Sequence, residues 1–131
     1  MKLFLLILLC VFSTYSLAET NKISYQNFRV EKSKLDIEIQ KVLDNLVYKY
    51  EEIDENSEKG YIGINDTYNK KISILDEGYK ERLEYWKKLI LVIESVKTKN
   101  ETEKADLEIL LIKANDQIKT LQKALEIPLN K

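Results

Sequence analysis

The 131-residue chain contains no histidine and only one cysteine, Cys10. Histidine is the usual general base near neutral pH, and histidine and cysteine are the common protein ligands of zinc and copper. Without histidine, none of the serines can take part in a Ser-His-Asp triad. We therefore expect a protein that is not an enzyme and that carries no metal or other cofactor.

Acidic side chains are the remaining candidates for chemistry, and they are crowded at residues 51–55. A pair of carboxylates could hydrolyse a glycosidic bond, and carboxylate oxygens could hold calcium. The segment after these acids lacks the acid spacing of a calcium-binding loop, and acids at the end of a helix commonly form a solvated face. We expect no catalytic or metal-binding residue in this run.

Glycine and proline are scarce, with three glycines and one proline in the whole chain. Sheets connected by tight turns need more of both, because these residues supply the backbone angles of most turns. Leucine, isoleucine, lysine and glutamate dominate instead. The composition predicts an all-α protein with almost no β structure.

The chain has no excess of charge of one sign, because its formal net charge is −1 and acidic and basic residues are interspersed throughout. Nucleic acid is attracted by a basic field, and anionic lipid is attracted by a polybasic segment. The sequence therefore predicts no nucleic-acid partner.

The longest apolar run lies at the N-terminus, where Lys2 precedes the apolar residues 3–12. Ser16 and Ala18 supply the small side chains that signal peptidase requires before its cut. The run is too short to span a bilayer, which takes roughly 20 residues. We predict a cleavable signal peptide at residues 1–18 and a single domain at residues 19–131, without a transmembrane segment and, once Cys10 is removed, without a disulfide. The expected location is extracellular, or periplasmic if the host is a Gram-negative bacterium.

Apolar residues of the mature chain recur at steps of three and four, the spacing that puts them on one face of a helix. The pattern predicts three helices, at about residues 24–57, 67–98 and 101–126. Short connections favour an antiparallel up-down-up three-helix bundle or an elongated helical rod, with packing of the coiled-coil type. The apolar stripes are expected to form the core. In the second helix the stripe consists of Tyr68, Ile72, Leu75, Tyr79, Leu83, Trp86, Ile90 and Ile93.

Gly60 and Asn100 mark helix ends. Gly60 can adopt the left-handed backbone conformation that follows a last helical turn. Asn100 can cap the third helix, with Glu103 at the position of a capping-box partner. Gly78, inside the second helix, indicates close packing or a slight bend, and a hinge is the alternative.

The connection after Gly60 contains the apolar residues Tyr61, Ile62 and Ile64. We expect them to fold over the end of the bundle. The alternative is an exposed apolar tip that contacts a partner.

Two Asn-X-Thr sequons begin at Asn65 and Asn100. Both fall at predicted helix junctions, where an acceptor is accessible. In a eukaryotic host, export would make Asn65 and Asn100 candidates for N-glycosylation, although Asn100 also has the competing role of a helix cap.

Several apolar residues fall outside the predicted stripes. At 100° per residue they point away from the packed face of each helix, and an apolar patch there indicates contact with a partner. The candidate interaction surface consists of Val30, Ile37, Tyr48, Leu91 and Ile109.

These features favour a secreted, noncatalytic helical protein that acts as a protein-interaction module. Its partner would be an unknown protein or a second copy of itself. The alternative is a carrier that binds a small apolar ligand or lipid in the helix interior or along its amphipathic faces, as the wide apolar faces of all three helices would allow.

Overall fold

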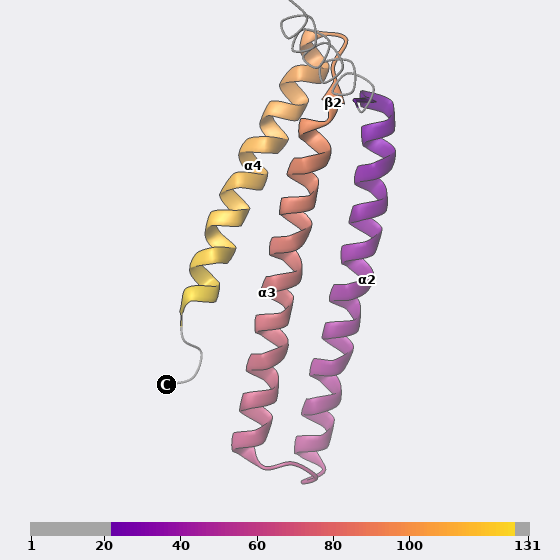
Figure 1. Cartoon of the computed structure of the whole chain (residues 1–131). Coiled ribbons are helices and arrows are strands. Elements are labelled where there is room, and N and C mark those ends of the chain that lie inside the picture. Colours follow the sequence, from indigo (N-terminus) through magenta and orange to yellow (C-terminus); the bar gives the residue numbers. More distant parts are fainter. Residues whose placement is uncertain (1–21, 128–131) are drawn as a thin grey trace, which may run out of the picture.

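The computed structural model describes residues 22–127, which form three long helices and two very short strands (Figure 1). The helices are α2 (Tyr25–Glu58), α3 (Ile64–Glu94) and α4 (Glu101–Glu126). The strands are β1 (Ile23–Ser24) and β2 (Val96–Lys97). The predicted all-α class is confirmed for the described residues.

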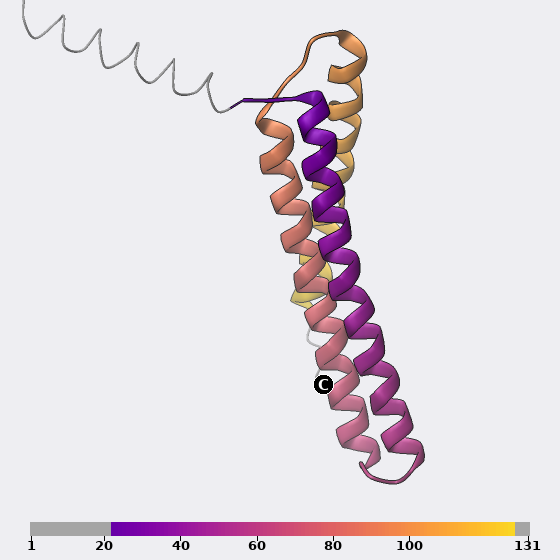
Figure 2. The same ribbon diagram turned by 90° about the vertical axis from the view of Figure 1, so that its right-hand side faces the viewer.

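Helices α2 and α3 form a hairpin whose two arms run in opposite directions (Figures 1 and 2). Asp54, near the end of α2, pairs with Lys71, near the start of α3. Further along the hairpin, the Lys88 ammonium lies 3.9 Å from the Glu38 carboxylate. The chain reverses at Gly60, whose φ of 74° lies in the left-handed region that favours glycine. Gly60 thus ends α2 as the sequence predicts.

Helix α3 differs from the predicted second helix at both ends. It begins at Ile64 instead of residue 67 and ends at Glu94 instead of residue 98. The hydroxyl of Ser95 donates to the carbonyl of Val92 at 2.7 Å and closes the last turn. The following residues are extended because β2 pairs with β1 in parallel, and the N–H of Ile23 donates to the Ser95 carbonyl at 2.9 Å. Strands of two residues have too little periodicity for the sequence to reveal them.

Helix α4 has the predicted bounds and the predicted cap. The Oδ1 atom of Asn100 accepts the N–H of Glu103 at 2.9 Å. The Glu103 carboxylate in turn accepts the N–H of Lys99 at 2.8 Å. These two side chains satisfy one amide of the first turn and one amide just before the helix, which fixes where α4 begins.

The best-packed part of the bundle is the end where α4 begins. Phe28, Leu89, Ile93 and Leu107, which come from all three helices, form one buried cluster. Leu89 is completely enclosed. Because α3 is contacted from two sides, its most buried residue is Leu89, which lies next to the predicted stripe and outside it.

The three helices differ in length. They contain 34, 31 and 26 residues in chain order. At 1.5 Å per residue these lengths are about 51, 46 and 39 Å. Helix α4 covers only part of the α2–α3 hairpin, and both views show the hairpin extending beyond it (Figures 1 and 2). We call residues 43–82, which include this extension, the free hairpin.

A polar cluster ties α2 to α3. The Tyr85 hydroxyl donates to the Asp36 carboxylate, which also accepts from the Lys32 ammonium at 2.6 Å. Burial, with this hydrogen bond, raises the pKa of Tyr85. Burial alone would raise the pKa of Asp36, but the hydrogen bonds from Lys32 and Tyr85 outweigh it and lower the pKa. The cluster is therefore most stable with Tyr85 neutral and Asp36 charged.

The predicted signal peptide at residues 1–18, with Cys10, lies outside the described residues. Cleavage and export therefore remain predictions. Of the helices between residues 22 and 127, none is long and apolar enough to cross a membrane.

Candidate functional site

All five residues of the predicted interaction surface are exposed. Their exposed fractions run from 48% for Val30 to 67% for Leu91 and Ile109. Val30, Ile37 and Tyr48 lie on α2, whereas Leu91 lies on α3 and Ile109 on α4. Val30, Ile37 and Tyr48 are seven and eleven residues apart and therefore share one face of α2. The role of all five residues as an interaction surface remains a prediction. A second set of exposed apolar residues lies on α3.

That set follows one face of α3. Ile64, Tyr68, Leu75 and Tyr79 are separated by steps of four, seven and four residues, so they lie on one stripe. Leu89 continues this face beneath α4 and is fully buried. From Leu89 toward the start of α3, the exposed fraction of the side chains on this face rises to 47% at Leu75, 60% at Tyr68 and 87% at Ile64. The face that α4 buries at one end of α3 is uncovered at the other end.

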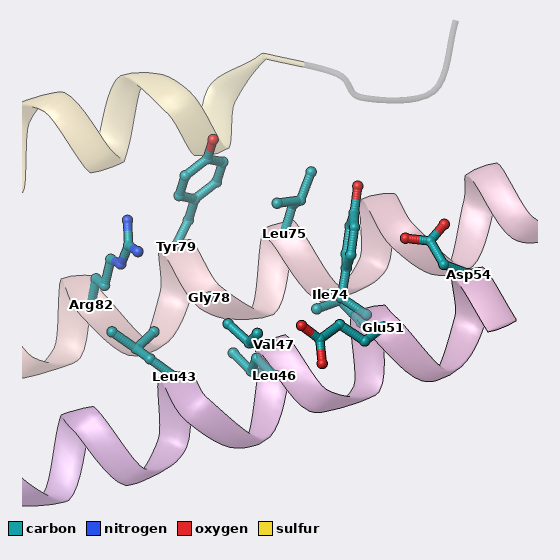
Figure 3. A pocket seen from close by; sticks show the side chains of 11 residues that line it. Leu43, Leu46, Val47, Glu51, Asp54, Ile74, Leu75, Gly78, Tyr79 and Arg82 are labelled. Atoms are coloured by element: carbon teal, nitrogen blue, oxygen red, sulfur yellow. The ribbon is translucent and has the colours of Figure 1, made fainter.

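An open groove of about 490 Å³ lies between α2 and α3 in the free hairpin (Figure 3). Its floor is largely apolar and is contributed by both helices. In Figure 3, Tyr79 points toward the end of α4, whereas Leu75 lies beyond that end. The volume is within the range of small-molecule pockets, and the open shape also suits an amphipathic helix.

Charged residues stand at the two ends of the groove. Arg82 lies nearest α4, and Glu51 and Asp54 lie toward the connection between the helices (Figure 3). Asp54 pairs with Lys71, and its hydrogen bond raises the pKa of Lys71. The Lys71 ammonium also lies 4.7 Å from the centre of the Tyr50 ring. Neither Arg82 nor Glu51 forms an ion pair with another residue in the described range, so the two ends of the groove present opposite charges.

The connection at the tip of the free hairpin is exposed. Tyr61 is 75% exposed and Ile64 is 87% exposed, whereas Ile62 is half-buried. The expectation that this connection folds over the end of the bundle is wrong for Tyr61 and Ile64. The reason is that α4 ends too early to offer them a surface.

The two sequon asparagines lie at opposite ends of the bundle, and both are exposed. Asn65 is in the first turn of α3, close to the tip of the free hairpin, and Asn100 caps α4. A glycan on Asn65 would therefore stand beside the uncovered stripe, and one on Asn100 would stand far from it. N-glycosylation at both positions remains a prediction.

The acidic run at residues 51–55 does not converge on one point. Within residues 22–127, no three histidine, cysteine, aspartate or glutamate side chains are placed to hold a metal ion. Asp54 is paired with Lys71, and Glu55 lies 3.7 Å from the ammonium of Lys59. This arrangement is that of a solvated helix face.

Sequence reasoning missed the groove because it assigned the groove residues to the core. Leu75 and Tyr79 belong to the predicted stripe of the second helix, and a stripe alone does not say how much of it is covered. The signal was present in the predicted helix lengths. A third helix at residues 101–126 is shorter than a first helix at 24–57, so part of the longer pair must be left uncovered.

Comparison with protein-family models, with curated proteins and with solved structures finds no match for this chain.

Proposed function

We propose that the chain is exported, that removal of residues 1–18 leaves an up-down-up three-helix bundle, and that this bundle is a noncatalytic protein-interaction module. The observation that supports the interaction role is one face of α3, which is enclosed at Leu89 and carries a stripe that is 47–87% exposed from Leu75 to Ile64. An apolar stripe that its own bundle does not cover is typical of a surface to which a partner binds.

The shape and charges of the groove also support a polypeptide partner. A helix laid between α2 and α3 would occupy, in the free hairpin, the place that α4 takes in the rest of the bundle. Arg82 and Glu51 attract opposite charges at the two ends of the groove, so they would fix the direction of that helix. The partner surface is therefore expected to be apolar along its middle and charged at its ends.

Native mass spectrometry of the protein purified from the cells that secrete it tests this role. We expect the chain to retain a polypeptide, either a different protein or a second copy. Leu75→Lys should remove that polypeptide, whereas Ile112→Lys, at an exposed residue of α4 outside the groove, should not. A bare monomer would contradict the interaction role.

The second candidate function is carriage of a small apolar ligand or lipid. The groove volume of about 490 Å³ favours it, and Arg82 is placed to hold an acidic head group at one end. Binding of a fluorescent fatty acid that Arg82→Gln weakens would support carriage. Failure of the chain to bind the fatty acid would contradict it.

A further inference from the structure

We propose that the occupant of the free hairpin is the free hairpin of a second copy of this chain, packed antiparallel across a two-fold axis. This inference rests on the proposed role as a protein-interaction module and names its partner. The length, register, charges and area of the uncovered stripe all fit a second copy.

The uncovered length of α3 fits such an overlap. Helix α4 ends beside Tyr79 (Figure 3). The stripe runs from there to Ile64 at the start of α3. Fifteen helical steps correspond to about 22 Å. In an antiparallel overlap of this length, the tip of each copy stops where α4 of the other copy ends. A same-direction overlap would instead drive the two α4 helices into each other, because α4 lies on the same side of the hairpin as the stripe.

The register of the stripe is self-complementary. Its midpoint falls between Lys71 and Ile72, and an antiparallel overlap about that midpoint puts Leu75 level with Tyr68 of the second copy. It also puts Tyr79 level with Ile64 of the second copy. The partly covered residues near α4 thus meet the most exposed residues near the tip. Each copy supplies the same surface to the other, as a two-fold interface requires.

The charges of the free hairpin favour the antiparallel direction. Arg82 marks the α4 end of the groove, whereas the last turns of α2 carry Glu51, Glu55 and Glu58 near the tip. The antiparallel overlap brings Arg82 of each copy toward the acidic end of the other. A same-direction overlap would place Arg82 beside Arg82 and acid beside acid, which is repulsive.

The apolar area suits a reversible dimer. Val47, Tyr61, Ile64, Tyr68 and Leu75 are 47–87% exposed. Side chains of this size expose on the order of 100 Å² each at such fractions. Two copies would together remove about 1,000 Å² of apolar surface from water, which is near the lower limit for a specific interface. We expect a Kd of about 1–100 μM.

Analytical ultracentrifugation of the mature chain, residues 19–131, tests the dimer. We expect a monomer–dimer equilibrium that Leu75→Lys weakens about tenfold or more. Ile112→Lys is the control, because it changes an apolar residue of α4 that is 70% exposed and does not line the groove. It should leave the Kd within about twofold. Circular dichroism checks that both variants keep their helices.

Disulfide cross-linking tests the direction and register. The mature chain contains no cysteine, so single cysteines can be introduced without background. In a mixture of Leu75→Cys and Tyr68→Cys chains, the antiparallel overlap predicts disulfides between the two variants, because their Cα atoms then come within about 7 Å. Each variant alone should cross-link poorly. Efficient cross-linking of each variant to itself would overturn the antiparallel register.

A wild-type chain that stays monomeric at about 1 mM would overturn the dimer. If that chain, taken from its native source, retains a different polypeptide that Leu75→Lys removes, the dimer is wrong and the interaction role stands. If no polypeptide is retained and no dimer forms, both are wrong.

Discussion

Leu46 and Gly78 meet at the floor of the groove, where the Cδ1 methyl of Leu46 lies 3.7 Å from the position that a Cβ atom would take on Gly78. This separation is an ordinary van der Waals contact, so a methyl group fits there. Helix α3 is continuous through Gly78. The glycine therefore lies where α2 and α3 are in contact, and α3 is not broken at this position.

The two glycines at the ends of the free hairpin should respond oppositely to alanine. Gly78→Ala is expected to raise the free energy of unfolding by about 1 kcal/mol, because alanine is favoured in a helix interior. Gly60→Ala is expected to lower it by about 1 kcal/mol, because a Cβ atom is strained at a φ of 74°. Urea unfolding at concentrations where every variant is monomeric measures both changes. Destabilisation by both substitutions would show that the contact with Leu46 is tighter than described.

Leu89 and Leu75 lie on the same face of α3 but should differ in their contribution to stability. Leu89 is fully buried, so Leu89→Ala is expected to lower the free energy of unfolding by about 2–5 kcal/mol. Leu75 is 47% exposed, so Leu75→Ala should lower that of the monomer by about 1 kcal/mol or less. Denaturant unfolding at low protein concentration makes the comparison. Equal losses would mean that Leu75 is covered within the monomer.

The hydrogen bond from Tyr85 to Asp36 predicts a loss of stability at alkaline pH. Tyrosines of the unfolded chain titrate near pH 10, at about the ordinary tyrosine pKa. The raised pKa of Tyr85 means that the folded chain holds this proton to higher pH, so the free energy of unfolding falls as pH rises above about 10. Tyr85→Phe should remove this part of the loss. Tyr25→Phe should reduce the alkaline loss of stability in the same direction, because a hydrogen bond to Asp106 also raises the pKa of Tyr25. Unfolding by urea at several pH values compares the two variants with the wild type.

The same hydrogen bond predicts a loss of stability in acid. The pKa of Asp36 is lowered in the folded chain, so the unfolded chain binds the proton more readily as pH falls below about 4. The contribution of Asp36 is therefore complete above that pH and lost below it. Asp36→Asn should make the free energy of unfolding less dependent on pH between about 5 and 2. An unchanged pH dependence in this variant would contradict the assignment.

Asn100 allows the cap and the sequon to be separated. Asn100→Ala removes the oxygen that accepts the Glu103 N–H and should lower the free energy of unfolding by about 1 kcal/mol. Thr102→Val destroys the sequon and keeps the cap, so unglycosylated protein should keep nearly its full stability. In protein secreted by a eukaryotic cell, Thr102→Val should lower the mass by one glycan if Asn100 is modified. An unchanged mass would contradict modification at Asn100.

Apolar spacing was sufficient to locate the helices. The third helix was predicted at residues 101–126, which are the bounds of α4, and the first was within one residue of Tyr25–Glu58 at each end. The end of α3 was missed by four residues, because the chain after Ser95 pairs with Ile23–Ser24 from the other end of the sequence. A pairing between such distant segments leaves no local pattern to read.

The sequence by itself determined the helical class, the bounds of α2 and α4 to within one residue, and the absence of histidine chemistry, because these depend on residue types and on interactions within a few residues. Only the tertiary structure decided which part of one face of α3 is core. Leu89 and Leu75 share that face, yet one is enclosed and the other is 47% exposed. The difference arises because burial depends on what packs against a residue, and α4 reaches Leu89 but ends before Leu75.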